Sequence, residues 1–172
     1  MTAASTLSHL EGSLSGRRYE VDRLQQTDPA DGRTLLARYN LEMARRTLTG
    51  ESVARRRGGL WRWTELLPVR DPRFIVTLGE GGTPLLRPSR LARALGLERL
   101  DLKAESLNPT GSFKARGMAV AVSRAAELGA RSLVAPSAGN AGGALAAYAA
   151  AGGLAATVVC PRTRRWRTNR RS

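Results

Sequence analysis

The sequence predicts an α/β protein in which helices cover a parallel sheet. Apolar runs of strand length alternate with segments of helix length over residues 100–104, 113–128, 133–136, 139–151 and 155–160. Gly129 and the pair Gly152-Gly153 follow the two helical segments, as glycine often does at a helix end. Strand–helix–strand order with short connections is typical of parallel sheets.

The residues before this pattern are predicted to form an extension, residues 1–72. Residues 1–32 are polar and rich in turn formers, which predicts an irregular or short-stranded lead-in. Residues 33–48 have apolar side chains at helical spacing, so we expect an amphipathic helix. Residues 51–71 are expected to be a loop-rich connector.

A second region, residues 73–161, is predicted to open with a strand at 74–78. A glycine-rich turn over residues 79–84 would break this strand. A short helix is expected at 89–95, with Ser89 as its N-cap. The last residues, 162–172, form a basic tail.

Composition narrows the class of protein. The chain has 172 residues with 42% hydrophobic content, which suits one domain or one domain with an extension. Cys160 is the only cysteine, so an internal disulfide is impossible and we expect no cysteine-based metal site. No signal-peptide pattern or membrane-length apolar run is found, and His9 is expected to be a surface residue. These features predict a cytoplasmic protein without a metal.

The net charge of +14 would ordinarily indicate a polyanionic partner such as nucleic acid. Six arginines, however, fall in the last eleven residues. A second cluster, Arg55-Arg56-Arg57, stands beside Gly58-Gly59 and is predicted to be a solvated loop. We therefore expect no membrane or nucleic-acid partner, with a basic nucleic-acid-binding module as the weakest alternative.

Residues 106–117 read Ser-Leu-Asn-Pro-Thr-Gly-Ser-Phe-Lys-Ala-Arg-Gly. The first part consists of turn formers, and Ser112 could cap the helix that follows. Lys114 would then lie in the first turn of that helix, where the helix dipole disfavours a cation and favours the neutral amine that a nucleophile needs. From this segment alone, a plain surface lysine remains the alternative.

Two further segments stand where strands end. Residues 137–143, Ser-Ala-Gly-Asn-Ala-Gly-Gly, follow a strand and open a helix, so their backbone N–H groups could face an anion. Residues 78–85, Leu-Gly-Glu-Gly-Gly-Thr-Pro-Leu, indicate a sharp turn. Each segment alone is a weak signal, because neither common nucleotide-binding fingerprint is present.

Taken together and in this order, the three segments resemble the fold-type-II pyridoxal-phosphate (PLP) enzymes, and threonine synthases in particular. The resemblance runs from about residue 10 to residue 161. It implies a tryptophan synthase β-like fold, present here as an N-terminal extension plus an incomplete parallel-sheet small domain. Full-length relatives are homodimers by the same resemblance.

The resemblance also implies residue roles and a reaction. Lys114 matches the lysine that holds PLP covalently, Ser112 and Phe113 match residues that set it against the ring, and Asn140 matches the partner of the ring oxygen. The substrate carboxylate would contact the loop residues Ser137, Gly139, Asn140 and Ala141. The implied reaction converts O-phospho-L-homoserine and water into L-threonine and phosphate, with a small amino acid as substrate.

The sequence departs from the family at three places. Gly12 and Ser15 stand where relatives often carry cysteines, which puts a zinc-ribbon-like role in doubt. Ala115 stands where many relatives carry aspartate. The tail does not resemble the family, yet one choice of codons for residues 162–172, read in another frame, gives Asp-Thr-Pro-Val-Ala-Asn. We therefore expect a frameshift near Arg162 and a truncated chain that is inactive alone.

Two other functions remain open from the sequence. A related fold-type-II lyase or synthase, threonine dehydratase-like or cysteate synthase-like, would share the same three segments. The basic binding module named above would lack the cofactor altogether.

Overall fold

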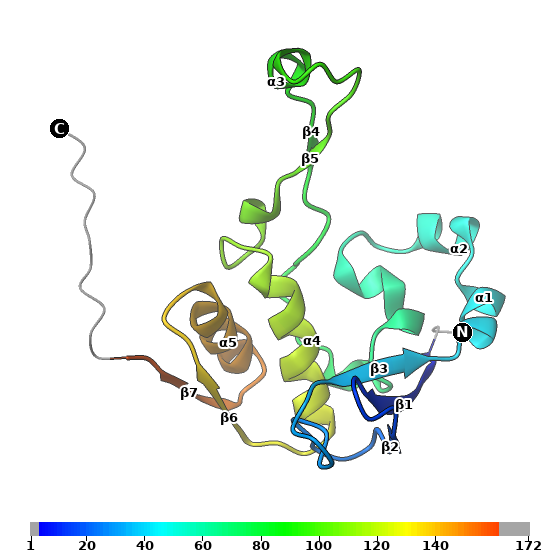
Figure 1. Cartoon of the computed structure of the whole chain (residues 1–172), viewed down its shortest axis with the longest axis vertical. Coiled ribbons are helices and arrows are strands. Elements are labelled where there is room, and N and C mark those ends of the chain that lie inside the picture. Colours follow the sequence, from blue (N-terminus) through cyan, green and yellow to red (C-terminus); the bar gives the residue numbers. More distant parts are fainter. Residues whose placement is uncertain (1–3, 162–172) are drawn as a thin grey trace.

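Figure 1 shows the computed structural model of the chain, which describes residues 4–161. The extension begins with an antiparallel sheet of order β2-β1-β3, formed by β1 (Leu7–Gly12), β2 (Arg18–Tyr19) and β3 (Leu35–Tyr39). The expected short-stranded lead-in is thereby confirmed. The predicted basic tail lies outside the described residues.

The prediction of a helix over residues 33–48 is wrong for the first half of that range. Residues 35–39 instead form β3, which pairs with β1 with Ala37 opposite Leu10. The helix α1 (Leu41–Thr47) starts only after Asn40, whose side chain accepts a hydrogen bond from Met43 N at 2.9 Å. Long-range strand pairing and this local cap together outweigh the helical spacing of the apolar residues.

The connector that follows is more helical than expected. It contains α2 (Gly50–Arg55) and the 3₁₀ segments η1 (Leu60–Leu66) and η2 (Pro72–Phe74). The strand predicted at 74–78 is wrong. Val76 N bonds to the Ser123 hydroxyl at 2.8 Å rather than to a neighbouring strand, so this segment runs along a helix.

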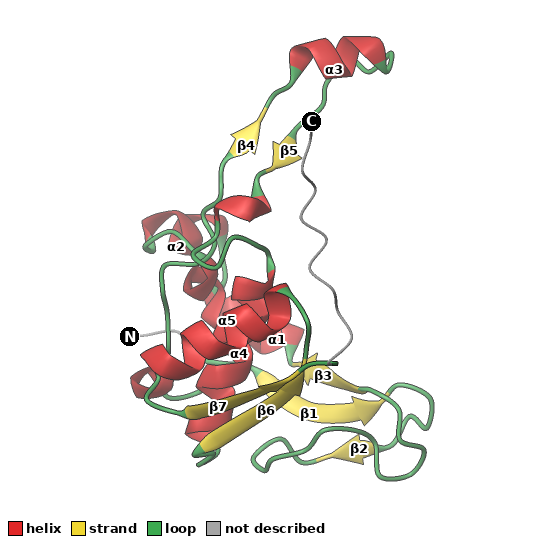
Figure 2. Cartoon of the chain, turned by 90° about the vertical axis from the view of Figure 1, so that its left-hand side faces the viewer, coloured by secondary structure: helices red, strands yellow, loops and turns green. Residues whose placement is uncertain are grey.

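A narrow arm projects from the body of the molecule (Figures 1 and 2). It consists of β4 (Leu85–Leu86), α3 (Ser89–Ala94) and β5 (Leu102–Lys103), with the two strands antiparallel. The helix is confirmed, but its predicted cap is wrong. Pro88 occupies the N-cap position and no side chain caps the helix, because Ser89 already lies inside it.

The remaining elements form the helix-covered sheet that the sequence predicts. After η3 (Glu105–Leu107) come α4 (Lys114–Glu127), β6 (Ser132–Pro136), α5 (Asn140–Ala151) and β7 (Ala155–Val159). Strands β6 and β7 are parallel, with Val134 opposite Thr157. The expected third strand, residues 100–104, forms β5 in the arm and pairs with β4 instead. The parallel sheet therefore has two strands within residues 4–161.

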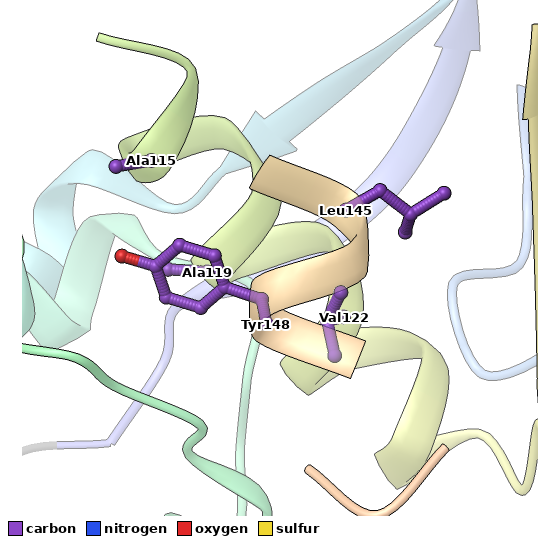
Figure 3. Close-up of a cluster of buried hydrophobic side chains, with 5 residues drawn as sticks. All are labelled: Ala115, Ala119, Val122, Leu145 and Tyr148. Carbon is purple, nitrogen blue, oxygen red and sulfur yellow. The ribbon is translucent and has the colours of Figure 1, made fainter. Parts of the chain in front are cut away.

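The core lies between α4 and α5 (Figure 3). Ala115, Ala119, Val122 and Tyr148 have no exposed surface. The small alanines of α4 let α5 approach closely, as the sequence predicts. A Cβ at Gly142 would come within 2.7 Å of Val158 Cγ1, so α5 also lies tightly against β7.

The extension is fastened to the C-terminal end of α4. Glu127 Oε1 accepts hydrogen bonds from Arg70 N at 2.8 Å and Asp71 N at 2.6 Å. Arg124 donates to Val21 O at 2.8 Å from the same turn of the helix. These bonds place the N-terminal sheet beside the helix that carries Lys114.

The stretch where relatives often carry cysteines contains an oxygen-based cluster. Asp28 is 1% exposed and accepts hydrogen bonds from the Ser15 and Tyr19 hydroxyls. A Cβ at Gly12 would lie 1.9 Å from Asp28 Oδ2, so this position has no room for a larger residue. Within the described part of the chain, no group of three potential ligands is placed to hold a metal. The same part contains no helix that is long and apolar enough to cross a membrane.

Candidate active site

Lys114 is the first residue of α4, as predicted, and its amine is uncommitted. Its Nζ lies 4.5 Å from the centre of the Phe113 ring. It makes no hydrogen bond or ion pair with any residue between 4 and 161. The other lysine, Lys103, donates its Nζ to Thr83 O. Of the two lysines, Lys114 alone therefore has an amine that is available to a ligand.

Ser112 does not act as the helix cap that the sequence predicts. Phe113 occupies the N-cap position in helical conformation, and no side chain caps α4. Ser112 is 7% exposed, and its Oγ is buried without a hydrogen-bond partner in the described region. The Thr110 hydroxyl is likewise buried without a hydrogen-bond partner in the described region. A buried hydroxyl without a hydrogen-bond partner is energetically unfavourable. Both hydroxyls are therefore suited to bond with a ligand or with a further protein group.

The loop before α5 is organised by Ser137. Its Oγ accepts hydrogen bonds from Gly142 N at 2.9 Å and Gly139 N at 3.3 Å. Asn140 is the first residue of α5 and is exposed, while Ala141 is half-buried. The N–H groups of the first helical residues have no acceptor within their own helix. The N-terminal end of α5 therefore presents the amide side chain of Asn140 and backbone N–H groups that have no acceptor within the helix.

The chain connections bring Lys114 and Asn140 to the same end of this layer. Each helix joins the start of a strand through a short link, α4 to β6 and α5 to β7. The strand starts lie side by side, because Ala155 N bonds to Arg131 O at 3.1 Å. Both helix C-termini therefore lie at that edge and both N-termini at the opposite edge, where the strands end.

A partly buried polar network joins two of the three segments. Arg116 donates to both oxygens of Glu105, from Nε and from an Nη, at 2.7 Å each. The same carboxylate accepts from the Thr83 hydroxyl at 2.6 Å and from Asn108 Nδ2 at 3.0 Å. Asn108 Oδ1 in turn accepts from Gly81 N at 3.0 Å. The glycine turn is thus held against the segment that presents Lys114.

Arg116 is the main cause that lowers the pKa of Glu105 to about 2, with the Thr83 hydroxyl second. A carboxyl whose pKa is depressed in the folded protein stabilises it above its unfolded pKa, which is about 4.3. We expect the free energy of unfolding to fall as the pH drops from about 5 toward 2, as Glu105 becomes protonated. Urea unfolding across that range should show a weaker pH dependence for Glu105→Gln than for the unchanged chain. Equal slopes would contradict the assignment.

Glu80 links the glycine turn to α5. Its carboxylate is 1% exposed and accepts hydrogen bonds from Trp61 Nε1 and the Tyr148 hydroxyl, both at 2.7 Å. Burial, followed by the bond to Glu80, raises the pKa of Tyr148. A buried carboxylate with donors from two elements fixes their relative position. The turn thereby sets the position of the helix that begins at Asn140.

Sequence reasoning missed Glu80, Glu105 and Tyr148 as members of the site. Glu80 stands among the turn glycines of residues 78–85, and this placement is a signal in the sequence. Tyr148 is the only large polar side chain in the alanine-rich helix, which also singles it out. No sequence feature indicates that Glu105 pairs with Arg116 across eleven residues.

The residues present suit a cofactor that is held by an amine. The Lys114 amine is free, the Ser112 and Thr110 hydroxyls are buried without partners, and the end of α5 supplies an exposed amide. PLP requires a lysine for covalent attachment and polar donors for its ring substituents. The site contains both kinds of group.

Comparison with known proteins gives a consistent set of similarities. Residues 76–171 match a family described as pyridoxal-phosphate dependent enzyme. The chain is 43% identical over 146 residues to the threonine synthase of Methanocaldococcus jannaschii, covering 85% of the chain and 36% of that protein. It is 48% identical over 103 residues to the threonine synthase of Methanosarcina acetivorans, covering 59% of the chain and 25% of the relative. For the Synechocystis threonine synthase the identity is 45% over 111 residues, covering 64% and 29%. The chain thus spans about a quarter to a third of the length of these relatives.

Proposed function

Because this chain belongs to the pyridoxal-phosphate-dependent enzyme family, we propose that it forms the lysine-bearing part of a threonine synthase. The proposed reaction takes O-phospho-L-homoserine and water to L-threonine and phosphate. The observation that carries the proposal is the free amine of Lys114 at the start of α4, beside buried hydroxyls without partners. The similarity to threonine synthases from several organisms supports this reaction over that of a dehydratase or cysteate synthase.

Each predicted site residue then has a separate task. Lys114 would hold the cofactor covalently, and its amine would move a proton at the substrate Cα. Phe113, whose ring lies 4.5 Å from the Lys114 amine, and Ser112 support the placement of that lysine. Asn140 would donate a hydrogen bond to the ring oxygen of the cofactor. The bound PLP supplies the electron sink for the reaction.

The loop at the start of α5 is proposed to receive the substrate carboxylate. Helix N-termini attract anions through their free N–H groups and the helix dipole. Gly139 leaves the backbone open to a ligand, and Ala141 adds an N–H group from the first turn. Ser137 already bonds to Gly142 N, so its main task is to shape this loop.

The wider arrangement is also proposed. Residues 1–72 act as an extension and residues 73–161 as part of the catalytic domain. The assembled enzyme is expected to be cytoplasmic and homodimeric, with a small amino-acid substrate and no nucleic-acid partner. Many arginines of the described region are paired with carboxylates, Arg116 and Arg124 among them, which lowers the charge available to a polyanion.

The test is an assay of phosphate release from O-phospho-L-homoserine in the presence of PLP. It compares the 172-residue chain with a version extended to the length of the relatives, and turnover is expected from the extended version only. In that version Asn140→Ala should retain PLP but lose turnover about tenfold or more, because one hydrogen bond to the ring oxygen is lost. Absorbance reports retention of PLP separately from turnover. Unchanged turnover in Asn140→Ala would contradict its role, and threonine dehydration or cysteate formation without threonine formation would favour the related enzymes.

A further inference from the structure

A half-open cavity of about 1210 Å³ lies between the loop after α2, the segment η1 and the glycine turn. Its walls include Arg57, Gly58, Trp61, Arg62 and Leu78. Neither Lys114 nor any other predicted cofactor or substrate residue lines it. The sequence predicted only a solvated basic loop here, so the half-open cavity is a product of the fold.

The cavity wall has an excess of positive charge. Four arginines line it, together with a single carboxylate, Glu80. That carboxylate is 1% exposed and already bonded to Trp61 and Tyr148. Arg55 pairs with Glu51 at 2.5 Å and Arg56 with the buried Glu65 at 2.6 Å. Two of the four positive charges are therefore balanced by carboxylates.

The other two arginines, Arg57 and Arg62, have no carboxylate partner. Arg57 makes no hydrogen bond or ion pair with any of the residues that the structure describes. Arg62 donates one Nη to Val53 O, and its Nε is buried without a partner in the same part of the chain. A buried donor without an acceptor is costly, and a guanidinium is well shaped to bind an oxyanion through two N–H groups.

We propose that this cavity binds a small organic molecule that carries a phosphate group. The phosphate would pair with the Arg57 guanidinium and with an Nη group of Arg62, next to the backbone of Gly58 and Gly59. Leu60, Trp61 and Leu78 provide an apolar wall for the rest of the molecule. A wall that combines unpaired cations with apolar surface favours an organic phosphate over a bare ion.

The site reaches the glycine turn through two short contacts. Leu60 N donates to Glu80 O at 3.0 Å, and Trp61 donates to the Glu80 carboxylate. The proposal does not depend on threonine synthase activity, because Arg57 and Arg62, which would contact the phosphate, take no part in the candidate active site. Binding can therefore be measured on the 172-residue chain without PLP.

The experiment is calorimetric titration of the full chain with phenyl phosphate and, separately, with inorganic phosphate, at constant ionic strength. Saturable binding is expected for both, with phenyl phosphate the tighter ligand. Arg57→Gln should weaken phenyl phosphate binding about tenfold, because one charge-assisted contact is lost. The matched control is Arg90→Gln on α3, which removes the same charge from an exposed arginine without a partner in residues 4–161 and should leave affinity unchanged.

A second readout places the ligand. The indole N–H signal of Trp61 should shift on titration in ¹⁵N nuclear magnetic resonance spectra, since that side chain lines the cavity. Equal losses of affinity in Arg57→Gln and Arg90→Gln would indicate general attraction to a basic protein and overturn the proposal. So would the absence of saturable binding, or saturation without a Trp61 shift.

Discussion

Lys114→Met is expected to abolish covalent attachment of PLP to the chain. Methionine keeps an unbranched apolar stem beside Phe113 but has no amine, so the fold should persist while the bond to the cofactor cannot form. The amine of Lys103 is less available, because it donates to Thr83 O. The expected effect is complete loss of the covalent adduct rather than a graded change.

Borohydride reduction of the PLP-treated chain, followed by peptide mapping, measures this directly. The unchanged chain and Lys103→Met should both give a pyridoxyl adduct on the peptide that contains Lys114. Lys114→Met should give none, while its circular dichroism spectrum matches that of the unchanged chain. An adduct on Lys103, or a persistent adduct in Lys114→Met, would refute the assignment of Lys114.

Gly81→Ala is expected to produce the largest loss of stability among single methyl additions in the glycine turn. Gly81 has φ +85°, a conformation that side chains rarely adopt. An added Cβ would lie 2.6 Å from Leu60 N and 2.9 Å from Gly59 C, both backbone atoms that cannot rotate away. Backbone strain at this φ and the overlap with backbone atoms together should lower the free energy of unfolding by about 3 kcal/mol or more.

Gly79→Ala is the matched control for this substitution. Its φ of +88° is similar, yet no atom lies within 4 Å of the added Cβ. It should therefore lose only the conformational contribution of about 1–2 kcal/mol. Urea unfolding of the two variants separates overlap from conformational strain. Equal losses would mean that the approach of residues 59–60 to the turn has no energetic consequence.

The sequence alone determined the elements whose signals are local. Glycines follow α4 and α5, and alanine-rich periodic segments precede them, so both helices and both parallel strands were predicted within a few residues. The three segments around Glu80, Lys114 and Asn140 likewise indicated the family. Their turn-forming residues and the lysine are recognised from the order of residues along the chain. In these places, local propensity and the final fold agree.

Only the tertiary structure decided the form of segments whose local sequence pattern is ambiguous or whose partners lie far away in the chain. Residues 35–39 have helical spacing, yet they form β3 because β1, at residues 7–12, offers a pairing edge. Residues 74–78 look like a strand, yet Ser123 on α4 binds their backbone. Such choices depend on which partner the folded chain brings alongside, and the spacing of apolar residues does not contain that information.

The same distinction applies to the candidate site. Lys114 and Asn140 could be identified from residue order, and Glu80 and Tyr148 stand out in their segments, but the hydrogen-bond partners of Glu80, Glu105 and Tyr148 could not be predicted. These polar side chains are held by partners from distant segments, as Tyr148 is by Glu80 across 68 residues. A buried polar group is stable only where the fold supplies its hydrogen-bond partners, so its role is settled by three-dimensional packing.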